Sequence, residues 1–250
     1  QFAWPSAEAR ARAISSGEYV PEHNVMTGLK VCGPHVSPRC VKEMVFPTIP
    51  RWRTGVPSTL NMLVHDDKGA PLLSPWPSCA ANDPHDGWKI EYGQGMEIDP
   101  GGVMCVSDVG RKYFAEFDNP AAADNTCPPK ILFIDVATGT ILENETYVFP
   151  TEVCPHDGCF LNDIALDLVN QVGFISDTAN NASDLGGVIV YSRREKPSRR
   201  LEDPRLSPRT RRPARRAIAQ LAHFAVARRV RLERLRRHLA RAESEEHLPY

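Results

Sequence analysis

The chain has 250 residues and a mass of 27.8 kDa, enough for one large domain or two smaller ones, each with a buried core. Hydrophobic residues make up 42% of the chain and charged residues 24%, as in proteins that fold and dissolve. No run approaches the roughly 18 apolar residues of a membrane helix, so we expect no membrane span.

The net charge of −1 is the average of two unlike parts. Residues 1–190 hold 12 Lys and Arg against 24 Asp and Glu, a balance of −12. Residues 191–250 hold 18 against 7, a balance of +11, and 17 of the 18 basic residues are Arg. Such a switch indicates a boundary, and we divide the chain into a body, 1–195, and an Arg-rich extension, 196–250.

Pro and Gly interrupt the body so often that long helices are not expected. One helix is predicted over Ser6–Ser16, with Ser6 as its cap and Gly17 as its stop. The rest is dominated by short, β-branched runs typical of strands. These runs are Met44–Phe46, Thr59–Val64, Met96–Ile98, Val103–Val106, Lys130–Ile134, Thr146–Phe149, Ile164–Leu168, Val172–Ile175 and Val188–Tyr191.

Part of this pattern occurs twice. The segment Glu97–Asp108, with its Ser-Asp ending, resembles Ala165–Asp177, and each copy is followed by one further apolar run. The repeated unit is therefore a hairpin, a long loop and another hairpin. Radial repetition of four-stranded sheets gives a β-propeller, so an all-β propeller is favoured over a β-sandwich with chance similarity.

The cysteines and sequons point to an extracellular protein. Cys32/Cys40 and Cys154/Cys159 each lie in a Gly- or Pro-bearing loop where a short-range disulfide is feasible. The odd count of 7 leaves at least one thiol unpaired, and Cys105 is expected to be free because it lies in an apolar run. N-glycosylation sequons begin at Asn144 and Asn181. The chain starts at Gln1 without Met, which is consistent with removal of a signal peptide.

Several segments, in order along 1–195, resemble one family. They are Trp4-Pro5, Ala13–Pro21, Phe46–Trp52, Gly55–Asn61, Pro71–Pro77, Cys127–Phe133, Leu161–Asp167, Phe174–Asp177 and Gly187–Tyr191. Together they are similar to the Yellow and major royal jelly proteins. Cys105 and Cys79 depart from the pattern, because the family has a tryptophan and usually an aromatic residue at these positions.

The resemblance implies a secreted six-bladed β-propeller with a central channel. A period near 68 residues gives six blades roughly four hundred residues, so the body is expected to form about three blades of a partial propeller. The expected function is binding of a small aromatic or amine ligand in the channel. The alternatives are a dopachrome-converting enzyme of pigment chemistry, and a storage or structural protein without a site. No cofactor and no metal are expected.

The resemblance places four polar residues, Arg51, Asn61, Asn162 and Asp163, on or beside the innermost strands. A channel lined by such groups would hold a small amine or catechol. For dopachrome conversion, a carboxylate or His would take the ring-carbon proton while Arg51 holds the substrate carboxylate.

Other polar and aromatic groups have structural interpretations. The sequence Pro-His-Asp-Gly at Pro84–Gly87 and Pro155–Gly158, and the His65–Asp67 group, are predicted to be turns rather than sites. Trp52, Trp76 and Trp88 are expected to pack between sheets. Asp108 and Asp177 end equivalent strands and are expected to accept backbone hydrogen bonds there.

The extension begins as an expected linker over 192–213, followed from Ala214 by a helical pattern with an Arg-filled face. Its composition is also what a GC-rich gene gives when it is translated in a reading frame that does not normally encode protein. Two interpretations of the extension therefore remain open, a gene-model artefact and a native basic extension. No nucleic-acid recognition motif is present. Because about three blades leave two sheet faces uncovered, self-association through these open faces is expected.

Overall fold

The computed structural model describes residues 1–83, 89–110, 127–156, 158–179 and 186–202. Residues Gln1–Glu202 form one compact unit, to which all that follows refers, and Asp203–Tyr250 fall in another. The helix expected from Ala214, the first Pro-His-Asp-Gly motif, Trp88 and Asn181 lie outside the described residues.

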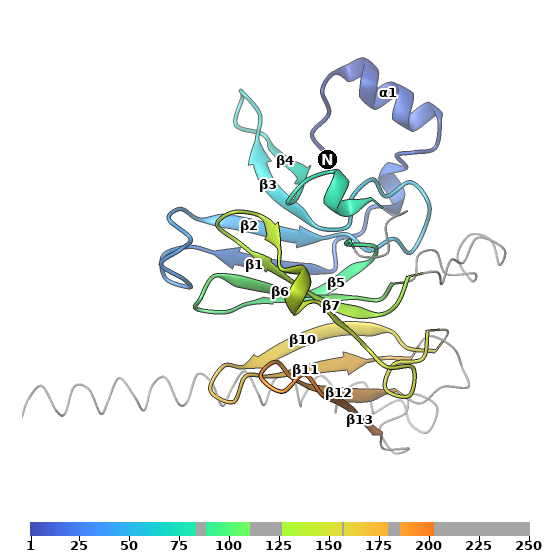
Figure 1. Cartoon of the computed structure of the whole chain (residues 1–250). Coiled ribbons are helices and arrows are strands. Elements are labelled where there is room, and N and C mark those ends of the chain that lie inside the picture. Colours follow the sequence, from blue (N-terminus) through green and yellow to red (C-terminus); the bar gives the residue numbers. More distant parts are fainter. Residues whose placement is uncertain (84–88, 111–126, 157, 180–185, 203–250) are drawn as a thin grey trace, which may run out of the picture. The chain divides into compact units, whose positions relative to one another are not determined.

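The unit contains one α-helix, short 3-10 turns and a series of antiparallel strands (Figure 1). They are α1 Ala7–Ser15, η1 Pro21–His23, β1 Gly28–Cys32, β2 Met44–Thr48, β3 Asn61–His65, β4 Pro71–Pro75, η2 Ala80–Asn82, β5 Gly93–Ile98, β6 Val103–Asp108, β7 Lys130–Asp135, β8 Thr140–Ile141, η4 Glu143–Glu145, β9 Tyr147–Val148, β10 Leu161–Asp167, β11 Val172–Asp177, β12 Gly187–Ser192 and β13 Ser198–Glu202. The predicted helix is confirmed, because the Ser6 hydroxyl accepts the Ala9 amide at 3.1 Å and Gly17 follows with φ +77°.

The strands form three successive blades. Blade 1 consists of β1 paired with β2 and β3 paired with β4, and a bridge between Thr48 and Leu60 joins the two hairpins. Blade 2 has the order β5-β6-β7-β8, with β9 also on β7, and blade 3 has the order β10-β11-β12-β13. Every apolar run predicted to be a strand overlaps an observed strand. The repeated segments form the equivalent hairpins β5-β6 and β10-β11.

The blades converge at their first strands, because β5 lies against both β1 and β10. Figure 1 shows the three sheets stacked in chain order, with β5 between β1 and β10. Sheets that fan out from a common inner edge are blades of a β-propeller, here a partial one of three blades. The expected fold class is confirmed.

Apolar side chains fill both blade junctions. Between blades 1 and 2, Phe46 and Trp76 pack with ring centroids 4.7 Å apart, beside Met96 and Leu132. Between blades 2 and 3, Phe133 and Tyr191 lie in one cluster with Ile164, Ile175 and Ile189. Trp76 therefore packs between sheets as predicted.

The strand-end aspartates tie the blade corners together. Asp108 accepts hydrogen bonds from the amides of Glu91, Tyr92 and Gly110, and Asp177 accepts those of Phe160 and Ala179. Each carboxylate also meets a cation, Lys130 for Asp108 and Arg200 for Asp177. Both disulfides, Cys32–Cys40 and Cys154–Cys159, are present, and Cys105 forms no disulfide, nor do Cys79 and Cys127.

The structure corrects one expectation about the extension and reveals three further strands that the sequence analysis did not identify, β1, β4 and the two-residue β8. Part of the expected linker is strand β13, which pairs along β12 from Tyr191↔Ser198 to Gly187↔Glu202. It was missed because it is a charged edge strand, Ser-Arg-Arg-Leu-Glu, with no apolar alternation. β1 and β4 were missed because Gly and Pro interrupt their apolar character.

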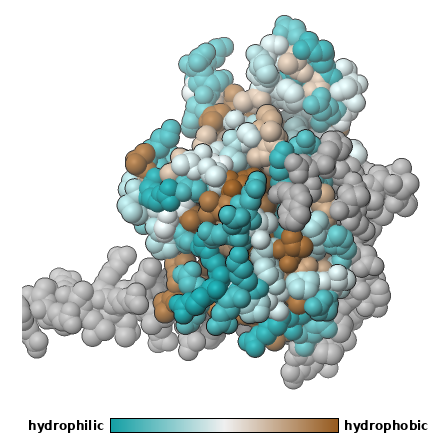
Figure 2. Space-filling model, viewed as in Figure 1, coloured by the Kyte–Doolittle hydropathy of each residue, from teal (hydrophilic) through white to brown (hydrophobic). Residues whose placement is uncertain are grey.

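Polar and apolar surface are distributed unevenly on the face shown in Figure 2. The tip of the β3–β4 hairpin is polar, as expected of the turn around Asp66, which accepts the amides of Lys68 and Ala70. Brown apolar surface lies over the sheets. Among the described residues, no helix is long and apolar enough to cross a membrane.

Candidate functional site

The three innermost strands form a polar surface that we call the inner-strand wall, made of Lys30, Gln94, Glu97, Asn162 and Asp163. Lys30 Nζ on β1 lies 3.0 Å from Glu97 Oε2 on β5. Gln94 Nε2 on β5 donates to Asn162 Oδ1 on β10 at 3.0 Å. Polar contacts therefore connect all three strands at the edge where a propeller has its channel.

Asp163 is the exposed carboxylate of this wall. β5 and β10 approach so closely here that a Cβ at Gly95 would lie 2.6 Å from the Asp163 Cα, and glycine is required at that position. The surrounding protein removes hydration from the carboxylate and so raises its pKa, an effect opposed by the Ile164 amide bond and the charge of Lys30. In the described part of the chain, Asp163 forms no ion pair.

The charges of the wall do not balance. Lys30 forms an ion pair with Glu97 and its charge also lowers the pKa of Asp163, so one cation of the wall faces two carboxylates and the wall keeps a net negative charge. A carboxylate whose pKa is raised by lost hydration gains free energy from a nearby cation. The wall can therefore accept an ammonium group.

Of the four residues expected to line the channel, only Asn162 and Asp163 lie on an innermost strand. Asn61 begins β3, the third strand of blade 1, where it is buried and its Nδ2 donates to the Ser58 carbonyl at 3.2 Å.

Arg51 is buried between connecting segments, with 1% of its surface exposed. Its guanidinium donates to backbone carbonyls, among them those of Asn82 at 2.6 Å and Val56 at 3.3 Å. These contacts hold the loops on either side of blade 1 together. Lys30 and Glu97 were not predicted, and the signal that would have found them is the charged residue near the middle of each inner strand.

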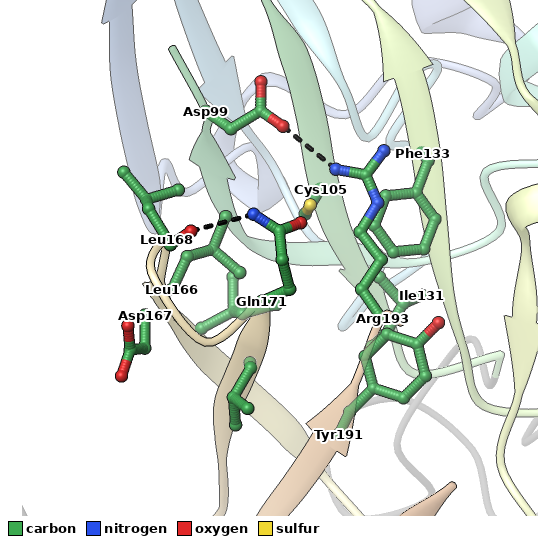
Figure 3. A pocket seen from close by; sticks show the side chains of 13 residues that line it. Asp99, Cys105, Ile131, Phe133, Leu166, Asp167, Leu168, Gln171, Tyr191 and Arg193 are labelled. Atoms are coloured by element: carbon green, nitrogen blue, oxygen red, sulfur yellow. Dashed lines mark hydrogen bonds and ion pairs between the residues drawn. The ribbon is translucent and has the colours of Figure 1, made fainter. Parts of the chain in front are cut away.

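A second polar site lies between blades 2 and 3 (Figure 3). It is a cavity of about 20 Å³, lined mainly by apolar side chains and by Cys105, Gln171, Tyr191 and Arg193. That volume holds about one water molecule. A more open pocket of about 400 Å³ shares Gln171, Tyr191 and Arg193 with it and is otherwise lined by Glu145, Arg194 and Lys196. Burial raises the pKa of the Cys105 thiol, so it stays protonated and unreactive.

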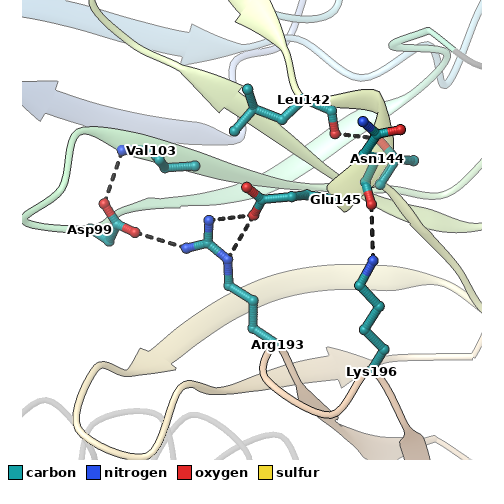
Figure 4. A network of polar contacts seen from close by, with 8 residues as sticks. Asp99, Val103, Leu142, Asn144, Glu145, Arg193 and Lys196 are labelled. Atoms are coloured by element: carbon teal, nitrogen blue, oxygen red, sulfur yellow. Dashed lines mark hydrogen bonds and ion pairs between the residues drawn. The ribbon is translucent and has the colours of Figure 1, made fainter.

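Arg193 closes this cavity and links the two blades (Figure 4). Its guanidinium donates to Asp99 at 2.9 Å and to Glu145 at 3.0 and 2.5 Å, and it lies 4.7 Å from the Phe133 ring centroid. The site therefore serves as a blade junction, with its cation already engaged.

The remaining predicted groups are structural where they are described. The second Pro-His-Asp-Gly motif is a turn, with the Gly158 and Cys159 amides donating to the Pro155 carbonyl at 3.2 and 2.8 Å. Asn144 is exposed on η4, as an acceptor of a glycan must be. Across the described ranges, no group of three or more His, Cys, Asp or Glu is arranged to hold a metal ion.

A partial propeller with a polar inner wall defines the class, and comparison with known proteins defines the family. The sequence profile described as "Major royal jelly protein" matches residues 95–221, about half of the chain. The chain belongs to this family. The matched range extends past residue 195, the boundary that composition indicates.

Curated relatives of this chain carry the name "Protein yellow". The proteins of Drosophila subobscura, Drosophila erecta and Drosophila melanogaster are 31%, 30% and 29% identical over 195 residues. The alignments cover 76% of this chain and 31–32% of each relative. The chain thus spans about a third of the length of the curated relatives it matches.

Proposed function

We propose that this chain is a secreted protein that binds a small aromatic amine on its inner-strand wall. The observation that carries the proposal is the second carboxylate, Asp163, beside the Lys30–Glu97 pair, which gives the wall a net negative charge. The ligand's ammonium would take the position next to Asp163, and its ring would lie along the wall.

The negative net charge of the inner-strand wall favours an amine over an anionic ligand. Lys30 is held by Glu97 at 3.0 Å, so the wall offers a carboxylate rather than a cation. An ion pair between ammonium and an exposed carboxylate contributes about 0.2–1 kcal/mol, and about 1.5–3 kcal/mol, or tenfold to a hundredfold in affinity, where the ligand's ring keeps water away from the pair.

We propose ligand binding and do not extend the proposal to dopachrome conversion. The cation expected to hold the carboxylate of dopachrome is Arg51, and its guanidinium is buried among backbone carbonyls. Secretion is supported by two disulfides, which persist in oxidising compartments, and by the exposed sequon at Asn144.

Calorimetric titration with dopamine, serotonin and catechol tests the ligand class. We expect the two amines to bind at least tenfold more tightly than catechol, which has the ring without the ammonium. Equal affinity for catechol would contradict a role for the carboxylate. Flat titrations with all three compounds would favour a storage protein without a site.

A further inference from the structure

An open pocket of about 400 Å³ lies between the turns of blade 3 and the segment η4 of blade 2. The β12–β13 turn contributes Arg193, Arg194 and Lys196 to its lining. The β10–β11 turn contributes Gln171, and η4 contributes Glu145. Figure 4 shows Arg193 and Lys196 extending from their turn toward η4. A pocket of this volume has room for a small organic molecule.

The β10–β11 turn of blade 3 corresponds to the β5–β6 turn of blade 2. The Gln171 carbonyl accepts the Arg193 amide at 2.9 Å, and the Gly102 carbonyl accepts the Val136 amide at the same distance. The backbone is left-handed at both positions, with φ +56° at Gln171 and +77° at Gly102. In blade 2 this position is crowded by blade 1, because a Cβ at Gly102 would lie 3.0 Å from Ser37 Oγ.

The β12–β13 turn corresponds in the same way to the β7–β8 turn. Lys196 donates its amide to the Ser192 carbonyl at 2.8 Å, and Gly139 donates its amide to the Asp135 carbonyl at 2.8 Å. Their φ angles are +61° and +71°. A Cβ at Gly139 would lie 2.8 Å from Pro77 Cβ. Blade 1 therefore fills the space beside the turns of blade 2, whereas the equivalent space beside the turns of blade 3 is the open pocket.

Both left-handed positions of blade 3 carry a side chain where blade 2 has glycine. A left-handed backbone costs free energy in a residue with a Cβ, and glycine avoids that cost. Strain of this kind concentrates at functional sites. Gln171 and Lys196 both line the pocket, which indicates that their side chains serve it.

Two cations of the pocket, Arg194 and Lys196, have no carboxylate partner in the described part of the chain. The Arg194 guanidinium is exposed, and Lys196 Nζ donates to a backbone carbonyl at 2.9 Å. Arg193, in contrast, is held by two carboxylates. Glu195 is exposed on the same turn and is not among the lining residues. The pocket can therefore accept an anion, and a guanidinium matches the two oxygens of a carboxylate.

We propose that this pocket binds a small organic carboxylate. Arg194 and Lys196 hold its carboxylate group, and Gln171 and Tyr191 lie beside the rest of the molecule. The charge preference is opposite to that of the inner-strand wall, and the proposal does not depend on amine binding there.

Titration of the full chain with benzoate and benzamide, followed by the NMR signals of each probe, tests the charge requirement. The two probes share a ring and differ in charge. We expect benzoate to bind at least about fivefold more tightly than benzamide, because two cations contact its carboxylate. Equal affinities, or no binding of benzoate, would overturn the proposal. Tighter binding of inorganic phosphate than of benzoate would overturn the assignment to carboxylates.

Lys196→Gly separates a ligand contact from a structural role. It removes the cation and gives the turn the residue of its blade 2 equivalent, so the unfolding temperature should be unchanged or higher. Benzoate binding should weaken at least about threefold in this variant and in Arg194→Ala. A lower unfolding temperature together with weaker binding in Lys196→Gly would mean that the lysine holds the turn rather than the ligand.

Lys42→Ala is the matched control, because it removes an exposed cation from the β1–β2 loop, away from the pocket. It should bind benzoate with native affinity. An equal loss in this control would indicate a general charge effect. Either that result or native affinity in both pocket variants would contradict the proposed site.

Discussion

Arg193 Nη1 lies 2.9 Å from Asp99 Oδ2, and this ion pair joins the end of β12 in blade 3 to the end of β5 in blade 2. The same guanidinium binds Glu145 and covers Phe133. One side chain thus adds ion pairs to a junction that also contains apolar contacts and the hydrogen bonds Gln94–Asn162 and Tyr147–Ser198.

Arg193→Ala should therefore lower the free energy of unfolding by about 2 kcal/mol, because two charge-assisted contacts and a cation–π contact are lost. Arg193→Lys should lose roughly half of that, since lysine cannot bind bidentately. Urea unfolding at fixed protein concentration measures both. Arg194→Ala, at the exposed neighbouring position, is the control, and an equal loss there would contradict the assignment.

Two tyrosines at the same junction should respond differently to removal of their hydroxyl groups. The Tyr191 hydroxyl is buried and has no hydrogen-bond partner among the described residues, whereas the Tyr147 hydroxyl lies 2.9 Å from Ser198 Oγ. Tyr191→Phe should leave stability unchanged or raise it by up to about 1 kcal/mol, and Tyr147→Phe should lower it by about 1 kcal/mol. The reverse order in thermal unfolding would contradict these contacts.

Alkaline pH provides an independent check on Tyr191. Burial raises the pKa of Tyr191 to about 12, so the native state holds this proton more tightly than the unfolded chain does. Its contribution to stability is complete below pH 10 and is lost as the pH rises through 12. Between these two pH values, the free energy of unfolding should fall less steeply with pH for Tyr191→Phe than for the native chain.

Blades 2 and 3 could be predicted because the hairpins β5-β6 and β10-β11 repeat apolar runs that end in a Ser-Asp pair. β1 and β13 could not be predicted, since Gly28 opens the former and Arg199 and Arg200 lie within the latter. These strands form only because neighbouring strands offer them a pairing edge, and a single sequence does not display that edge. Of the expected site residues, Asn162 and Asp163 lie on an innermost strand, whereas Arg51 is charged but buried, and Lys30 was not considered because it belongs to an unrecognised strand.

The cysteines should divide into three classes under alkylation. Cys79 is exposed and should react in the native state, whereas Cys105 and Cys127 are buried and should react only after unfolding. The four remaining cysteines should react only after reduction, and peptide mass spectrometry would reveal any other pairing.

Replacing the two cysteines of either disulfide with alanine should lower the free energy of unfolding by roughly 2–3 kcal/mol, because the unfolded chain gains loop entropy.

Glycosylation at Asn144 tests the secretory assignment. Asn144 is exposed beside the last turn before β9, so an oligosaccharyltransferase can reach it. Protein secreted from insect cells should lose mass on treatment with an N-glycosidase, and Asn144→Gln should remove the part of that loss due to this site. An unchanged mass loss in the variant would show that Asn144 carries no glycan.

We propose that Asp163 binds the ammonium group of an aromatic amine. Calorimetric titration of dopamine into the Asp163→Asn variant measures this contact most directly. The matched control is Asp167→Asn, because Asp167 lies on the same strand but is engaged by Asn170 and the turn amides, which lower its pKa. Because desolvation raises the pKa of Asp163, dopamine affinity of the native chain should fall as the pH drops from 7 toward that pKa. We predict at least a tenfold loss of affinity at pH 7 in Asp163→Asn, with little remaining pH dependence, and native affinity in Asp167→Asn. Native affinity in Asp163→Asn would contradict the account.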